Sequence, residues 1–188
     1  MTLERAHWRR WQRRVDPRRL VFLDETGLNT KMLRHYGRAQ GGARCFDRAP
    51  HGHWHTSTFI AALRCERVEA PWLLDGPMNA LAFEAYCRHV LGPTLREGDI
   101  VICDNLSSHK SLPAKQAIEQ AGARLRYLPP YSPDLNPIEM LFAKIKAHLR
   151  ARATRTIEQL TQALAQTLTT LDDKLCSNLF KHANYQSI

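Results

Sequence analysis

Short apolar runs and amphipathic segments alternate along the chain. Residues 20–23 are four consecutive apolar residues followed by the polar sequence DETG, which predicts a buried strand that runs into a turn. The same criteria predict further strands at 44–46, 56–64, 67–74, 99–103 and 123–128, and helices at 79–91, 111–121, 137–150, 156–171 and 173–181. Strands come first, then alternate with helices, and helices end the chain. This order predicts an α/β fold in which a mixed β-sheet is flanked by α-helices.

Length and charge narrow the classes of protein to consider. The chain has 188 residues, 44% of them hydrophobic, which is enough for one domain with a real core and argues against disorder. Lysine and arginine number 27 against 18 aspartates and glutamates, so the net charge is +9. Such an excess favours a polyanionic partner such as nucleic acid over an acidic small molecule.

Much of this charge lies at the N-terminus, so we divide the chain into a basic N-terminal arm at 1–19 and a domain at 20–188. The arm has seven arginines and two acidic residues. We expect Arg9, Arg10, Arg13 and Arg14 to contact a DNA backbone. Two interpretations remain for the tryptophans at positions 8 and 11: they stack on nucleic acid, or they cover the core from an amphipathic helix.

Cysteine and histidine spacing argues against disulfides and zinc. The five cysteines are far apart and include no C-x-x-C pair, which is typical of reduced thiols in a cytoplasmic protein. The alternating His51, His53 and His55 have no companion ligand at zinc-site spacing. No apolar run reaches the roughly 18 residues of a membrane span, so we expect no membrane association and a cytoplasmic, nucleoid-associated protein.

Three acidic residues stand where carboxylates can converge. Asp24 and Asp104 each follow a predicted strand, and Glu139 lies in the first turn of a predicted helix. Hard cations such as Mg²⁺ prefer a few carboxylates with substrate phosphates completing the coordination sphere. Each acid also has a structural interpretation: the aspartates as turn residues, and Glu139 as part of a capping box with Asn136.

The pattern of the helix that begins near residue 137 favours the functional interpretation of its glutamate. An apolar stripe covers one face, and it comprises Ile138, Leu141, Phe142, Ile145 and Leu149. Glu139 lies on another face together with Lys146 and Arg150. An acid followed by two cations on one face suits a metal ligand beside a DNA backbone.

Three sequence blocks identify a family. The strings LDET, DNLSSH and LPPYSPDLNPIE contain the three acids, and 34 residues separate Asp104 from Glu139. Together they resemble the catalytic domain of mariner-like DDE transposases of bacterial insertion sequences. The resemblance implies an RNase H-like fold in which Asp24, Asp104 and Glu139 are catalytic and bind two Mg²⁺ or Mn²⁺ ions. Asp134 is a rival third ligand, but it lies five residues before the matching position.

The resemblance also implies roles for neighbouring residues and for the whole protein. Glu25, Asn105 and His109 are expected around the metal ligands, with His109 or Asn105 orienting Asp104 or contacting DNA, or serving a structural role. The implied activity is DNA cleavage at transposon ends followed by strand transfer into target DNA. Two alternatives stay open: an RNase H-like nuclease without strand transfer, and an inactive DNA-binding remnant.

The expected partners are transposon-end and target DNA and a second copy of the chain in a homodimer on DNA. Members of the family carry helix-turn-helix modules before the catalytic domain. Only the basic arm precedes the first predicted strand here. We therefore expect either that a helix-turn-helix segment is encoded separately, or that this chain is a truncated copy or an expressed domain of a longer transposase.

Overall fold

A five-stranded mixed sheet forms the centre of the molecule. The computed structural model describes residues 2–34, 36–46 and 54–186. The strands have the spatial order β3-β2-β1-β4-β5. Their bounds are β1 (Leu20–Asn29), β2 (Thr56–Leu63), β3 (Val68–Asp75), β4 (Ile100–Cys103) and β5 (Arg124–Tyr127). The first three strands pair antiparallel, whereas β4 and β5 run parallel to β1, so the predicted mixed sheet is confirmed.

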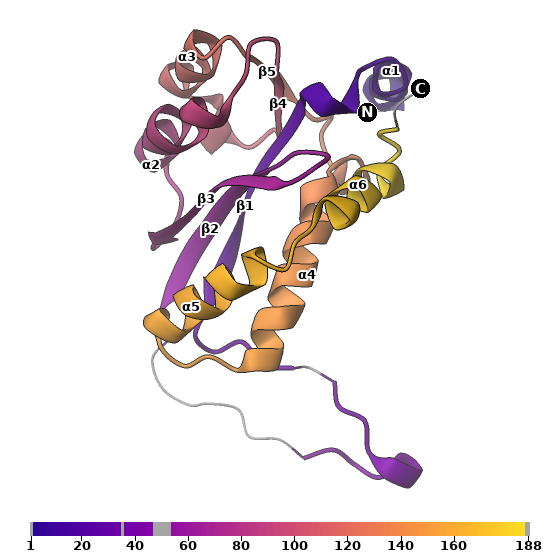
Figure 1. Ribbon diagram of the computed structural model, residues 1–188, viewed down its shortest axis with the longest axis vertical. Helices are drawn as coiled ribbons and strands as arrows, with labels where there is room; N and C mark the ends of the chain where they lie inside the picture. Colours follow the sequence, from indigo (N-terminus) through magenta and orange to yellow (C-terminus); the bar gives the residue numbers. More distant parts are fainter. Residues whose placement is uncertain (1, 35, 47–53, 187–188) are drawn as a thin grey trace.

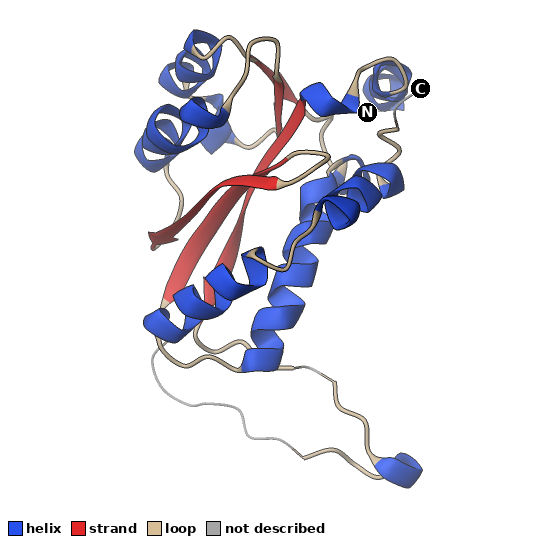
Figure 2. Ribbon diagram, in the orientation of Figure 1, coloured by secondary structure: helices blue, strands red, loops and turns tan. Residues whose placement is uncertain are grey.

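Helices cover both faces of the sheet. They are α1 (Thr2–Gln12), α2 (Ala80–Tyr86), α3 (Leu112–Gln120), α4 (Pro137–Arg152), α5 (Ile157–Leu168) and α6 (Asp173–His182). Figures 1 and 2 show α2 and α3 on one face and α4, α5 and α6 on the other, with α1 beside the C-terminal end of the chain. A π-helical turn at Cys87–Leu91 continues α2, so the predicted helix at 79–91 is confirmed. None of the helices described is long and apolar enough to cross a membrane.

The central strand β1 builds two separate cores because its side chains alternate between the faces of the sheet. Leu20 and Phe22 belong to the cluster packed against α4, α5 and α6. Val21 and Leu23 belong to the cluster under α2 and α3. All four side chains are fully buried, which explains why this strand is a continuous apolar run in the sequence.

The structure corrects two predicted strand boundaries. Residues 44–46 form an exposed loop and not a strand, because no neighbouring strand pairs with them in the described chain. The first strand does not end at residue 23 but continues to Asn29, because β2 pairs with it along that whole length. Asp24 therefore lies within the central strand and not in a turn after it.

Helix α1 packs onto the domain through its tryptophans. Trp8 is 3% exposed, and its indole nitrogen donates a hydrogen bond of 2.8 Å to the hydroxyl of Tyr185. That hydroxyl in turn donates to the carbonyl oxygen of Leu135 over 2.9 Å. Trp11 is half-buried against the same core. The tryptophans thus cover the core, which is the second of the two interpretations offered for them.

We expect Tyr185→Phe to destabilise the fold, because the change leaves the Trp8 N–H and the Leu135 carbonyl without their buried partner. The loss should be about 1–3 kcal/mol in the free energy of unfolding. It should appear in thermal unfolding as a decrease in Tm of about 2–4 °C per kcal/mol. Tyr36→Phe is the matched control, since Tyr36 is 93% exposed and should leave the Tm unchanged. Equal Tm values for the two variants would contradict this account.

Candidate active site

Asp24 lies where β1 separates from its parallel neighbour. The pairing with β4 ends at Phe22 and Ile102, whereas β2 continues alongside and places Ala61 opposite Asp24. The alternation of β1 directs the Asp24 side chain toward α4, and it directs Glu25 toward the opposite face. Asp24 is 9% exposed, so its carboxylate is nearly removed from water.

Two hydrogen bonds hold the Asp24 carboxylate. The backbone N–H of Glu25 donates to one oxygen over 2.8 Å, and the side-chain amide of Asn136 donates to the other over 2.9 Å. Asn136 is the N-cap residue of α4, as predicted, but its side chain forms no capping hydrogen bond. The predicted capping box is therefore wrong. The side chain of Asn136 is oriented so that Nδ2 donates to Asp24, and Oδ1, the atom that would cap the helix, has no partner among the described residues.

Asp104 follows the end of β4 and is fixed by a buried histidine. Its Oδ1 lies 2.5 Å from Nδ1 of His109 and accepts a hydrogen bond of 3.2 Å from the N–H of Leu106. The other ring nitrogen of His109 lies 2.7 Å from Oε2 of Glu25. Burial lowers the pKa of His109, but the hydrogen bonds to Asp104 and Glu25 outweigh it and raise that pKa to about 9. His109 is thus an imidazolium at neutral pH that links the two carboxylates.

Glu139 brings the third carboxylate to the same place from the first turn of α4. A cavity of about 460 Å³ opens between β1, β4 and α4. Its polar lining residues include Asp24, Glu25, Asp104 and Glu139 together with Lys146 and Arg150. The three acids singled out in the sequence and the two cations of the α4 face therefore share one cavity.

Crowded carboxylates make the charge of Asp24 costly. Burial raises the pKa of Asp24, the Glu25 backbone hydrogen bond lowers it, and the charges of Asp104, Glu25 and Glu139 raise it further, to about 7. In the described part of the chain, none of the three acids Asp24, Asp104 and Glu139 forms an ion pair with lysine or arginine. Lys146 and Arg150 therefore line the same cavity without occupying the oxygens of these carboxylates.

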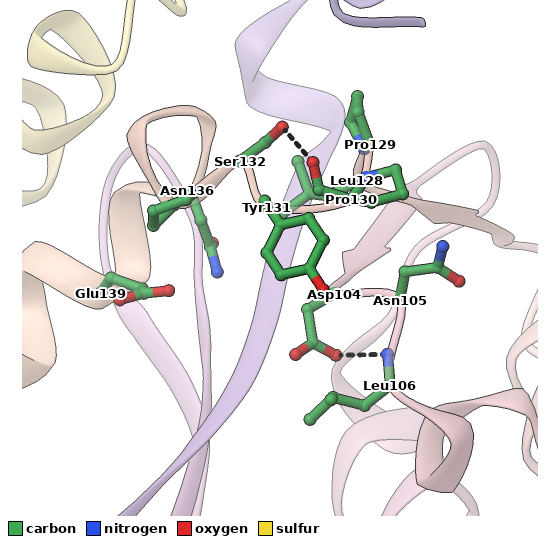
Figure 3. A pocket seen from close by; sticks show the side chains of 11 residues that line it. Asp104, Asn105, Leu106, Leu128, Pro129, Pro130, Tyr131, Ser132, Asn136 and Glu139 are labelled. Carbon is green, nitrogen blue, oxygen red and sulfur yellow. Dashed lines mark hydrogen bonds between the residues drawn. The ribbon is translucent and has the colours of Figure 1, made fainter. Parts of the chain in front are cut away.

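A second cavity, of about 570 Å³, adjoins the first (Figure 3). Asp104 and Asn105 lie on one side of it, Asn136 and Glu139 on the other, and the loop at 128–133 forms its apolar wall. Tyr131 stands out from that loop with 88% of its surface exposed and a left-handed backbone, at a φ of 51°. Asn105 is exposed here, and no hydrogen bond links it to Asp104.

Asp134, the rival third acid, points elsewhere. Both of its oxygens accept hydrogen bonds from the Arg5 guanidinium, over 2.7 and 2.9 Å, and Arg5 also donates to Ser132. Asp134 lines neither cavity. Its role in the structure is to fasten α1 to the loop before α4, and the position of Glu139 suits the cavity instead.

The remaining candidates lie apart from the carboxylates. Arg9, Arg10, Arg13 and Arg14 are exposed and line neither cavity, although Arg9 approaches Asp134 to 3.8 Å. Two of the three clustered histidines, at positions 51 and 53, are outside the described residues.

The carboxylates fit divalent cations by the chemistry of their donor atoms. Across residues 2–34, 36–46 and 54–186, no three acidic, histidine or cysteine side chains are grouped tightly enough to hold one ion as they stand. However, the side-chain oxygens of Glu139 and Oδ2 of Asp104 have no hydrogen-bond partner among those residues. Unpaired carboxylate oxygens are the ligands that Mg²⁺ and Mn²⁺ prefer.

The fold and the carboxylate arrangement define a class of protein. A family model described as DDE superfamily endonuclease matches residues 19–161, which is most of the chain. The chain therefore belongs to the DDE superfamily endonucleases. No curated protein shows significant similarity to it.

Solved structures of Mos1 transposase share the fold. The Mos1 paired-end complex with Mg has a TM-score of 0.75 at 19% identity, over 96% of this chain and 57% of that chain. The Mos1 paired-end complex with the left transposon end has a TM-score of 0.74 at 18% identity, over 95% of this chain and 56% of that chain. The catalytic domain of Mos1 mariner transposase has a TM-score of 0.66 at 19% identity, over 96% of this chain and 85% of that chain. The fold is therefore RNase H-like, and this chain spans little more than half of the longer Mos1 chains.

We expect Asn136→Ala to destabilise the protein at pH 8, above the Asp24 pKa of about 7. The ionised Asp24 would lose the one side-chain hydrogen bond that it accepts from the described residues, at a cost of about 1.5–3 kcal/mol. Thermal unfolding measures the change. Asn105→Ala is the matched control, because the Asn105 side chain is exposed and forms no hydrogen bond within the part of the chain that the structure describes. A Tm of Asn136→Ala equal to that of the control would show that the amide does not support Asp24.

Proposed function

We propose that this chain is the catalytic domain of a transposase that cleaves DNA at transposon ends and transfers the freed strand into target DNA. One observation carries the proposal: carboxylates from β1, β4 and α4 line a single cavity with two cations from α4. The arrangement suits a phosphodiester, because Lys146 and Arg150 attract its phosphate while Asp24, Asp104 and Glu139 would hold the metal ions that act on it.

We propose Mg²⁺ or Mn²⁺ as the cofactor, with two ions per site bound by Asp24, Asp104 and Glu139. When bound, such ions activate the attacking oxygen and stabilise the leaving oxygen of a displacement at phosphorus. The support from this chain is the crowding of carboxylates that raises the pKa of Asp24, together with the side-chain oxygens of Asp104 and Glu139 that have no hydrogen-bond partner among the described residues.

The chain's own residues fix the carboxylates before any ligand binds. Asn136 holds Asp24 from α4, and the His109 imidazolium holds Asp104 from one side only, which leaves Oδ2 free. Glu25 holds the other edge of His109. Because these contacts stabilise the carboxylates without pairing them with lysine or arginine, their charge stays available to a cation.

Cleavage and strand transfer need the same machinery. In cleavage, water attacks phosphorus and the 3′-oxygen leaves as a hydroxyl; in strand transfer, that 3′-hydroxyl attacks a target phosphodiester. Each step breaks one phosphoester bond and forms one P–O bond, so no covalent link to the protein is required. Support for a transposase comes from the Mos1 complexes, described as paired-end and strand transfer complexes. Action as a homodimer on paired ends, with a helix-turn-helix segment reading those ends, is part of the proposal.

Asp24→Asn, Asp104→Asn and Glu139→Gln should each lower DNA cleavage by at least about 10³-fold, because losing a metal ligand removes several kcal/mol of transition-state stabilisation. A plasmid-nicking assay with Mg²⁺ or Mn²⁺ measures the change. Asp134→Asn is the matched control: it lies in the same motif but contacts Arg5, so cleavage should persist. Cleavage that survives in any of the three, or fails equally in the control, would contradict the assignment.

Joining of pre-cut ends to a target plasmid tests the finer part of the proposal. A transposase joins pre-cut 3′-hydroxyl ends, and the same three substitutions abolish joining. Nicking without joining would indicate a nuclease without strand transfer. Neither activity, with DNA binding intact, would indicate an inactive remnant.

Divalent ions should raise the Tm of the protein, because a cation that binds only the folded state relieves the repulsion around Asp24. At about 100 times the dissociation constant the gain is about 2.7 kcal/mol. Thermal shift with Mg²⁺ and Mn²⁺ measures it, and EDTA should reverse it. Glu139→Gln should reduce the shift and Asp134→Asn should preserve it. The same shift in both variants would place the ions elsewhere.

A further inference from the structure

Three adjoining cavities cross the carboxyl end of the parallel strands. The cavity that contains Asp24 shares Asp104, Leu106 and Glu139 with the cavity in Figure 3. That second cavity shares the loop at 128–130 and its neighbour Asn105 with a third, of about 330 Å³. The first and third have no lining residue in common, so the second lies between them.

The third cavity contains an arginine that lies over two neighbouring aromatic rings. Arg126 is the second-last residue of β5 and pairs with Ile102 of β4. Its guanidinium carbon lies 4.8 Å from the ring centroid of Trp8 and 3.9 Å from that of Trp11. The indole of Trp8 is itself fixed by its hydrogen bond to Tyr185. The guanidinium therefore has a defined position before any ligand arrives.

Arg126 has no anionic partner in the described chain. No ion pair or hydrogen bond of its side chain is found there, and partial burial lowers its pKa. By contrast, the buried Arg64 pairs with Asp99 and Glu69, and Arg5 pairs with Asp134. Glu4 also lines the cavity, from the exposed first turn of α1. A stacked guanidinium keeps its N–H edge free, and that edge matches the oxygens of a phosphate.

We propose that Arg126 binds a backbone phosphate of a single DNA strand that runs across the carboxylates toward Lys146 and Arg150. The inference rests on the proposed function, since it identifies where the substrate strand lies relative to the site. Cations then stand at both ends of the series of cavities, with the carboxylates and the apolar wall of Pro129 and Pro130 between them. A strand held at two places is positioned for displacement at the phosphorus between them.

The test measures binding without cleavage. Fluorescence anisotropy in EDTA follows a labelled oligo-dT of about 16 nucleotides as salt rises from about 50 to about 200 mM. Arg126→Gln should reduce the slope of log affinity against log salt by about 0.7, which is one single-strand phosphate contact. At about 0.1 M salt this corresponds to about fivefold weaker binding.

Two variants separate a phosphate contact from a structural role. Arg124→Gln removes the same charge from an exposed position on the same strand and should leave the slope unchanged. Arg126→Lys keeps the charge but loses the planar stack, so it should retain the slope even if its Tm falls. An unchanged slope in Arg126→Gln, or equal weakening in Arg126→Lys and Arg126→Gln, would overturn the proposal and leave Arg126 as a support for α1.

The outcome is independent of catalysis. If the wild-type chain fails to cleave DNA but Arg126→Gln still lowers the slope of log affinity against log salt, the phosphate site is supported and the proposed activity is contradicted. If the wild-type chain cleaves DNA and Arg126→Gln leaves the slope unchanged, the activity is supported and the phosphate site is contradicted.

Discussion

The buried carboxylate of Asp24 is the constraint on which the site depends. It stands in the central strand, covered on both faces, so its charge loses hydration and its pKa rises to about 7. A lysine or arginine there would neutralise the charge and occupy the oxygens. Instead, an amide from Asn136 and a backbone N–H stabilise the carboxylate and leave its negative charge in place. The small side chain of Ala61 is opposite it on the neighbouring strand.

The same strand explains why the adjacent acid, Glu25, has a different environment. Neighbouring residues of a strand point to opposite faces, so Glu25 meets His109 under α2 while Asp24 meets Asn136 under α4. His109 is fully buried, with its ring 4.6 Å from that of Phe83. Through this histidine Glu25 reaches Asp104 at the end of β4. The neighbouring residues Asp24 and Glu25 of β1 thus contribute carboxylates to opposite faces of the sheet.

Contacts from both ends of the chain hold the loop that leads into α4. Arg5 of α1 bonds Ser132 and Asp134, and Tyr185, which follows α6, bonds the carbonyl of Leu135. Glu139 lies further along the chain, in the first turn of α4. The basic N-terminal segment is therefore packed against the domain, and it also adds to the charge of the surface.

The sequence by itself determined the order of strands and helices and the mixed sheet, because periodicity and turn residues report local structure. It singled out Asp24, Asp104 and Glu139 through the resemblance of the motifs that contain them to those of a known family. Its errors were also local in origin: residues 44–46 have β-like composition without a partner, and the DETG string resembles a turn although β2 pairs with it. Only the tertiary structure decided that Asn136 bonds Asp24, 112 positions away, instead of capping α4. It likewise decided that Arg126 rests on Trp8 and Trp11. Such contacts join residues whose spacing in the sequence follows no period, so local patterns cannot predict them.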